Sequence, residues 1–249
     1  MYTLVALIVF VQTFQASSKL YGYKDVEIPE CDNYTIMNHN LRRDITYWHN
    51  SIRSSLQMPW RENDRDRLPN SSHMNLLNYD CELEKTAYNI AQSCPDNSNP
   101  SFDYTGSNNY TGELLYEGYY ASFVLRAYWS WYSTWEANKN GTPLEDLKPT
   151  NENAPMIPFL QTMVGNMTKL GCAFNLNCMN STNSSFVSFV CQYGEPHVKL
   201  GIPIYTNGTP CSECVGSCVR RHGLMQQHNL LICRNNKAFD QTTFILQHS

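Results

Sequence analysis

The sequence lacks long apolar segments, clusters of basic residues and internal repeats. Charged residues make up only 16% of its 249 residues, and the formal net charge is −4. Basic residues meet in short pairs such as Arg42-Arg43 and Arg220-Arg221. Binding of nucleic acid or of an anionic membrane needs a basic surface, so the composition indicates neither function. The apolar run Leu4–Phe10 is too short to cross ~30 Å of hydrocarbon, which takes about 20 apolar residues.

The start of the chain predicts export from the cell. The apolar run is followed by Ala16-Ser17-Ser18, and a short hydrophobic segment before small residues is the pattern of a secretory signal. We therefore expect residues 1–18 to be a signal peptide cleaved after Ser18, and the mature protein to be secreted and extracellular. The alternative is a buried N-terminal strand. The C-terminal Phe244–Leu246 is too short to serve as a lipid-anchor signal.

The cysteines fit an oxidising compartment. Their number, ten, is even, and all follow the expected cleavage point, which predicts five disulfides whose pairing one sequence does not define. The spacing Cys211-x-x-Cys214-x-x-x-Cys218 leaves zinc as an alternative, although no second Cys/His pair follows at zinc-finger spacing. The ten are Cys31, Cys81, Cys94, Cys172, Cys178, Cys191, Cys211, Cys214, Cys218 and Cys233.

N-glycosylation signals are frequent. Eight Asn-x-Ser/Thr sequences in one exported chain predict a glycoprotein whose modified asparagines face solvent. The eight asparagines are Asn33, Asn70, Asn109, Asn140, Asn166, Asn180, Asn183 and Asn207.

Hydrophobic periodicity predicts helices first and an antiparallel hairpin late in the chain. A central sheet covered by helices on both faces satisfies this order. The third helix carries many aromatics, which we interpret as core packing, with an exposed aromatic binding patch as the alternative. The expected helices are 36–57, 76–94, 121–136 and 159–169, the strands are 170–176 and 186–193, and the loops are 59–72, 95–111, 138–155 and 177–185.

Six short motifs occur in a defined order between about residues 40 and 214. In this order and at these spacings, the chain resembles the CAP superfamily of cysteine-rich secretory, antigen 5 and pathogenesis-related-1 proteins. It most resembles the activation-associated and venom-allergen-like secreted proteins of parasitic nematodes. The motifs are HNSIR at 49–53, YDCELEKTA at 79–87, GELL at 112–115, KLGC at 169–172, FVCQYG at 189–194 and the segment 201–214.

The resemblance implies an α+β fold, a three-layer α-β-α sandwich with a short Cys-rich C-terminal tail. We expect the CAP domain over residues 34–194, a Cys-rich hinge-like extension over 195–218, and a flexible, partly ordered C-terminal tail over 219–249.

The family's metal site is incomplete in this sequence. Many CAP proteins hold a divalent metal with two histidines and two glutamates, and zinc needs about four such ligands. Glu113 matches the first glutamate, but Thr134 and Pro158 stand at the positions of the second glutamate and of one histidine. No histidine exists between His73 and His197, where both family histidines belong. We therefore predict no bound metal, no cofactor and a structural role for Glu113.

The sequence gives no indication of catalysis, because it shows neither a nucleophile beside a base nor paired carboxylates. His49 lies on a helix and is predicted to be a hydrogen-bonded packing residue. The missing histidines argue against a metal-dependent or proteolytic enzyme.

The resemblance instead implies a non-enzymatic parasite protein that binds a host cell-surface or immune partner, as hookworm neutrophil- and platelet-inhibiting proteins bind integrins. The alternative is a carrier of sterols or fatty acids, with the aromatic third helix lining an apolar groove.

Overall fold

The computed structural model describes Val26 and residues 28–32, 36–55, 68–95, 106–114, 119–141, 144–222 and 229–234, so the predicted signal peptide lies outside it. The helices are α2 (His39–Ser55), α3 (Cys81–Gln92), α4 (Tyr120–Asn138) and α5 (Ile157–Thr162), with the 3-10 turns η2 (Glu145–Leu147) and η3 (Asn151–Met156). The strands are β1 (Asn78–Tyr79), β2 (Ser107–Gly112), β3 (Lys169–Met179), β4 (Ser185–Tyr193), β5 (Ser217–His222) and β6 (Asn229–Arg234).

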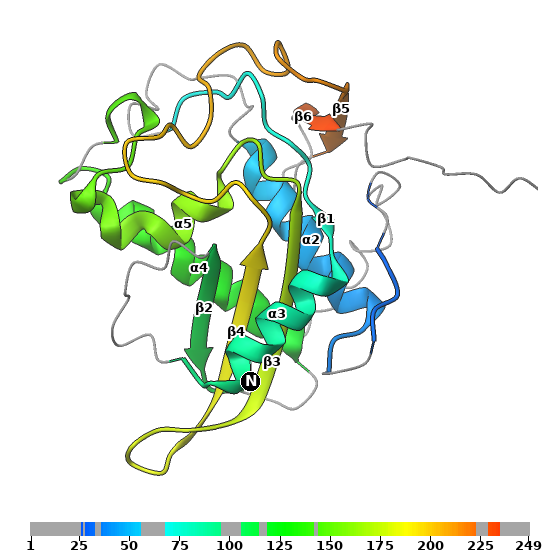
Figure 1. Cartoon of the computed structure of the whole chain (residues 1–249), viewed down its shortest axis with the longest axis vertical. Coiled ribbons are helices and arrows are strands. Elements are labelled where there is room, and N and C mark those ends of the chain that lie inside the picture. Colours follow the sequence, from blue (N-terminus) through cyan, green and yellow to red (C-terminus); the bar gives the residue numbers. More distant parts are fainter. Residues whose placement is uncertain are drawn as a thin grey trace, which may run out of the picture.

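The main sheet has the strand order β1-β3-β4-β2. The long strands β3 and β4 are antiparallel neighbours, with Cys172 directly opposite Cys191. The short β1 pairs parallel with β3, and β2 pairs antiparallel with β4 at the other edge. Helix α3 covers one face of β3 and β4, while α2 and α4 lie on the other face (Figure 1). The predicted three-layer α-β-α sandwich is confirmed.

The face of the sheet toward α3 is built from small side chains. Ala173 and Val190 pack against Ala87 and Ala91 of α3 in a separate buried cluster. A Cβ added at Gly171 would overlap the backbone of the first turn of α3. Helix and sheet therefore approach closely here, and this closeness requires glycine at position 171.

The opposite face is aromatic. Successive side chains of a strand point to opposite faces, so Phe174 and Phe189 alternate with the small residues and meet the helices behind the sheet. Their ring centroids are 4.5 Å apart. Phe123 of α4 lies edge-on to Phe174, and Trp131 of the same helix stacks parallel to Phe189. Full burial of each such ring stabilises the fold by about 2–3 kcal/mol.

The second helix is shorter than predicted. Residues 76–80 are extended, and α3 begins only at Cys81. Asp80 accounts for this boundary, because its backbone N–H donates to the carbonyl of Leu170 on β3 at 2.8 Å. Its side-chain oxygen then accepts the backbone N–H groups of Glu82 and Leu83 as an N-cap. Pairing with a strand about 90 residues later is invisible to local periodicity.

The fourth helix was also predicted too long, since α5 ends at Thr162 rather than near Lys169. The buried guanidinium of Arg53 takes the carbonyls of Thr162 and Val164 at 2.9 Å each, which diverts these carbonyls from a helical ladder.

The predicted loop 95–111 was wrong in its second half, because 107–112 form the edge strand β2. Its sequence, SNNYTG, shows no apolar alternation, and pairing with β4 alone makes it a strand.

The C-terminal tail, which we expected to be flexible and partly ordered, contains an ordered hairpin. Strands β5 and β6 are antiparallel, and the boundary expected between residues 218 and 219 falls inside β5. Ile232 and Cys233 of β6 are buried at 1% exposure. The backbone of Cys233 bonds to that of Met74 and Leu76, which docks the hairpin beside β1. In the part of the chain described here, no helix has the length and apolarity needed to span a bilayer.

Candidate functional site

The three residues predicted at the family's ligand positions lie on three different parts of the fold: Glu113 after β2, Thr134 on α4 and Pro158 on α5. Glu113 directly follows this strand, is exposed, and its carbonyl accepts a 2.6 Å hydrogen bond from Arg126 of α4. Thr134 of α4 donates its hydroxyl to the carbonyl of Trp131 at 2.6 Å. The carbonyl of Pro158 in α5 accepts the side-chain amide of Asn108 at 2.7 Å. One carboxylate with a hydroxyl and a proline does not fit a zinc ion.

A buried polar chain lies behind these positions. The hydroxyl of Tyr193 lies 2.9 Å from Nε2 of His49 and 3.3 Å from the amide nitrogen of Asn108, which also reaches Pro158. Nδ1 of His49 is 2.9 Å from the carbonyl of Ile45. This carbonyl requires a proton on Nδ1, so Nε2 accepts from the tyrosine hydroxyl. The chain joins α2, β4, β2 and α5, and the predicted packing role of His49 is confirmed.

Burial perturbs the titration of this chain. The pKa of His49 lies well below its usual value because burial disfavours its charged form, and the nearby positive charge of Arg53 adds to the effect. Burial likewise raises the pKa of Tyr193. Both side chains are inaccessible, at 0% and 1% exposure. Their pKa shifts therefore follow from packing, and neither side chain is open to a substrate.

Arg53 carries a large set of buried hydrogen bonds. It is 0% exposed and donates to the carbonyls of Asn75, Thr162, Val164, Gly165 and Met167 at 2.8–3.4 Å. Burial lowers its pKa to about 9, so the guanidinium stays charged at neutral pH. Arg53 falls within the motif HNSIR, but the sequence predicts no role for it, because its carbonyl partners lie up to 114 residues away.

The buried carboxylate of Glu84 is also committed to structure. It forms a two-bond ion pair with Arg42 at 2.7 and 2.8 Å and accepts the hydroxyl of Tyr79 at 2.7 Å. Side chains of the ion pair are 1% exposed. The pair ties α2 to α3 past the edge of the sheet and offers no open acid or base.

Helix α4 divides its aromatics between core and surface. Phe123, Tyr128, Trp131 and Trp135 are buried, which agrees with the core-packing interpretation. Trp129 is the exception at 62% exposure, and its ring meets the half-buried Tyr132 edge-on at 5.9 Å. A large exposed aromatic on a rigid helix is the kind of side chain that anchors protein interfaces.

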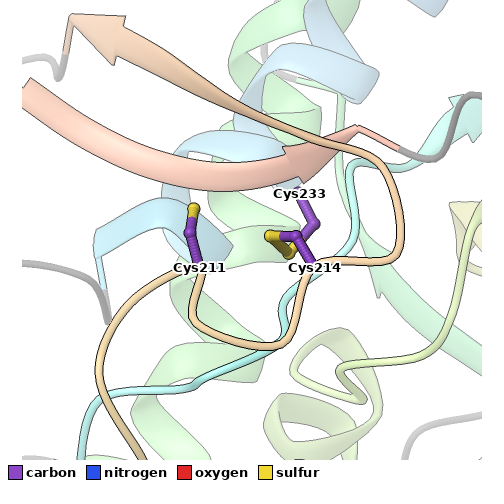
Figure 2. A group of neighbouring side chains, drawn as sticks. All are labelled: Cys211, Cys214 and Cys233. Atoms are coloured by element: carbon purple, nitrogen blue, oxygen red, sulfur yellow. A yellow bond between two sulfur atoms is a disulfide. The ribbon is translucent and has the colours of Figure 1, made fainter.

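All ten cysteines form disulfides. The pairs are Cys31–Cys81, Cys94–Cys178, Cys172–Cys191, Cys211–Cys218 and Cys214–Cys233. The sulfur atoms of Cys211, Cys214 and Cys233 lie within 4.8 Å of one another (Figure 2), and they are the one grouping of potential metal ligands among the described residues. Each of these sulfurs is already bonded to another, so none supplies the thiolate that zinc takes.

The predicted glycosylation sites lie mostly on the surface. Asn33 falls outside the described residues. Five of the others are exposed, namely Asn140, Asn166, Asn180, Asn183 and Asn207, while Asn70 and Asn109 are half-buried. Asn70 and Asn207 line the same open hollow. Their two segments lie side by side because the backbone N–H of Gly208 donates to the carbonyl of Asn70. Glycosylation itself stays a prediction.

The model of the cysteine-rich secretory protein family, CAP, matches residues 39–193, from the start of α2 to the end of β4. The chain belongs to the CAP family. This CAP chain is 25% identical to hookworm platelet inhibitor 1 of Ancylostoma caninum, over 78% of its own length and 83% of the relative's. It is 27% identical to a scoloptoxin of the centipede Scolopendra dehaani, over 72% and 80% of the two chains.

Among solved structures, the CAP protein NaASP2, crystallised with Zn²⁺, is similar at a TM-score of 0.61 and 28% identity, over 76% of this chain and 96% of that one. A further relative, of Ancylostoma caninum, is named a secreted protein and is 28% identical over 77% of this chain and 46% of that one. The assignment of Thr134 and Pro158 to the family's metal-ligand positions stays a prediction.

Proposed function

We propose that the protein is a secreted, non-enzymatic CAP glycoprotein of a parasite that binds and modulates a host cell-surface or immune protein. The observation that carries the proposal is the match to the CAP family over residues 39–193. The predicted metal-ligand positions of that scaffold hold Thr134 and Pro158 in place of ligands. Without the metal-ligating side chains, the outer surface of the fold is the part that we expect to carry the function. The relative named a platelet inhibitor supports the same reading.

The interior supports a non-enzymatic role. His49, Glu84 and Arg53 have the chemistry of catalytic groups, but each is buried and bonded within the protein. A general acid or base must come within hydrogen-bond reach of a substrate, and these side chains have no open side from which a substrate approaches.

The exposed face of α4 is the binding surface that we favour. Trp129 offers a large side chain with few rotatable bonds, and Tyr132 supports its edge. Tryptophan and tyrosine dominate the energetics of protein interfaces, where truncation of one anchor costs about 2 kcal/mol or more. Loss of Trp129 should therefore weaken binding by about 30-fold or more.

The experiment is a cross-linking capture by the glycosylated, secreted protein on live leukocytes and platelets, read by mass spectrometry. We expect one enriched receptor, lost with Trp129→Ala and kept with the matched control Tyr88→Ala on α3, the helix of the opposite layer. An integrin is the specific candidate for this receptor. Capture of a receptor that is not an integrin contradicts the integrin candidate and leaves the general proposal of a host cell-surface partner standing. No enrichment over a metal-binding CAP protein contradicts the proposal.

The alternative of a sterol or fatty-acid carrier has less support. The aromatics that would line its groove, Phe123, Trp131 and Trp135, pack in the main core. Titration with labelled cholesterol and palmitate tests this function, and saturable binding of either lipid would restore it.

A further inference from the structure

Four cysteines near the C-terminal hairpin bring their sulfur atoms together from three segments, which are the turn at 211–214, β5 and β6. Cys211 and Cys214 lie on one turn, closed by a 3.3 Å bond from the N–H of Cys214 to the carbonyl of Cys211. Cys218 stands on β5 directly opposite Cys233 on β6. The sulfurs of Cys211, Cys214 and Cys233 lie within 4.8 Å of one another (Figure 2). Cys218 completes the group through its bond to Cys211.

This arrangement is compatible with two disulfide pairings. The pairing present is Cys211–Cys218 with Cys214–Cys233. The second would join Cys211 to Cys214 across the turn, and Cys218 to its ladder partner Cys233. Residues directly opposite in an antiparallel ladder have Cα atoms about 4.5–5.5 Å apart, within the range that a disulfide spans.

We propose that Cys211, Cys214, Cys218 and Cys233 form a thiol-exchange site, which passes between these two pairings when an external thiol reacts with the Cys211–Cys218 bridge. This bridge is the accessible one, because Cys218 is exposed while Cys233 is 1% exposed. The backbone of Cys211 is left-handed, with φ of 64°, a strained conformation for a non-glycine residue. Opening of the bridge allows that strain to relax.

The exchange proceeds by three attacks of a thiolate on a disulfide sulfur. The external thiolate attacks Sγ of Cys218, forms a mixed disulfide, and leaves the electron pair on Sγ of Cys211. The Cys211 thiolate attacks Sγ of Cys214, and Cys233 leaves as a thiolate. Cys233 then attacks Sγ of Cys218 and releases the external thiolate. One thiolate enters and one leaves, so the thiol acts as a catalyst without net oxidation or reduction.

The two pairings differ in what holds the hairpin to the body. Glu213 fixes the turn, because its carboxylate accepts the hydroxyl of Ser72 at 2.7 Å and its backbone carbonyl lies 2.7 Å from Nδ1 of His73. The Cys214–Cys233 bridge connects this fixed turn to β6. In the second pairing one disulfide closes the turn and the other joins β5 to β6, so β6 loses its direct disulfide link to the turn. The site therefore sets how firmly the hairpin is docked.

A single substitution tests the exchange without added thiol. Cys218→Ser leaves Cys211, Cys214 and Cys233 with one free thiol among them, and cleavage after Glu213 and Arg220 separates the three onto different peptides. After acid quenching and alkylation of free thiols, we expect at least half of the label on Cys233, with Cys211 and Cys214 joined in a disulfide. Label confined to Cys211 would overturn the proposal.

A second variant tests the other new bridge. Cys211→Ser/Cys214→Ser leaves Cys218 and Cys233, which we expect to join, so that thiol titration of the unfolded protein finds no free thiol. The matched control is Cys31→Ser/Cys94→Ser. It leaves Cys81 at the start of α3 and Cys178 on β3, beside the opposite end of that helix, so two free thiols are expected. Two titratable thiols in the first variant contradict the second pairing.

Discussion

The disulfides Cys172–Cys191 and Cys214–Cys233 each join residues 19 apart in the sequence, but they lie in different surroundings. Cys172 and Cys191 face each other in the central ladder β3–β4, and both are 0% exposed within the aromatic core. Cys214 is half-buried on a surface turn, and its partner lies on a two-stranded hairpin.

Because both disulfides join residues 19 apart, removing each one in turn compares their surroundings in the native state. Closing loops of the same length removes the same chain entropy from the unfolded state, about 3 kcal/mol for either bridge. Any difference in the effect of removing them must therefore come from the native state. The body, residues 39–193, is held by a core and buried polar networks. The tail, which begins at Cys211, is held mainly by covalent links.

The largest effect is expected from Arg53→Met, which removes the polar centre of the body. Of the five carbonyls that Arg53 binds, those of Val164 and Gly165 keep a backbone N–H donor. The other three, on Asn75, Thr162 and Met167, would lose the donor that Arg53 supplies. Each orphaned group costs about 1–3 kcal/mol, so we expect a loss of roughly 4 kcal/mol or more in the free energy of unfolding. Urea unfolding measures it. Arg126→Met is the control, because Arg126 binds a single carbonyl near the surface; equal losses would show that the network of Arg53 carries no special weight.

Removal of the body bridge by Cys172→Ala/Cys191→Ala should cost about 3 kcal/mol from loop entropy alone. The cavity left by two buried sulfurs adds to this loss. We expect the urea midpoint of the body to fall with an unchanged slope, followed by the fluorescence of the core tryptophan Trp131. A midpoint that stays in place would mean that packing of β3 on β4 makes the disulfide redundant.

Acid should destabilise the body through His49. Its folded pKa lies below the unfolded value of about 6.5, so the unfolded chain binds more protons between these values. This contribution to stability is complete above pH 6.5 and is lost as pH falls toward the folded pKa. The slope of the free energy of unfolding against pH reaches about 1.4 kcal/mol per pH unit. We expect that decline between pH 6.5 and 5.5 in urea titrations of the wild type, and a flatter profile for His49→Gln. Identical slopes would contradict the assignment.

The smallest effect on the body is expected from Cys214→Ala/Cys233→Ala in the tail. The free energy of unfolding followed by Trp131 should change by less than about 0.5 kcal/mol, because the tail opens locally before the body unfolds. Limited proteolysis should instead cleave the segment after residue 210 several-fold faster. If the body midpoint shifts as much as in Cys172→Ala/Cys191→Ala, the tail and body unfold as one unit, and the contrast between them is lost.

The sequence predicted the elements whose signal is local. The apolar rows of α2 and α4 follow helical spacing, and the alternation of β4 marks a strand, so these elements appear close to where they were expected. It failed at β2, at the start of α3 and at the end of α5. At each of these places a partner distant in the chain decides the backbone, namely β4, Leu170 of β3, and Arg53.

The sequence alone determined the family, the even set of cysteines and the absence of histidine between positions 73 and 197, because these are facts of residue identity and spacing. Only the tertiary structure decided which cysteines meet, why Trp129 is exposed while Trp131 is buried, and that Arg53 binds carbonyls from two distant segments. Such choices depend on which surfaces the sheet and its helices bring together. Burial and buried hydrogen bonds act through space, and a one-dimensional pattern does not contain those distances.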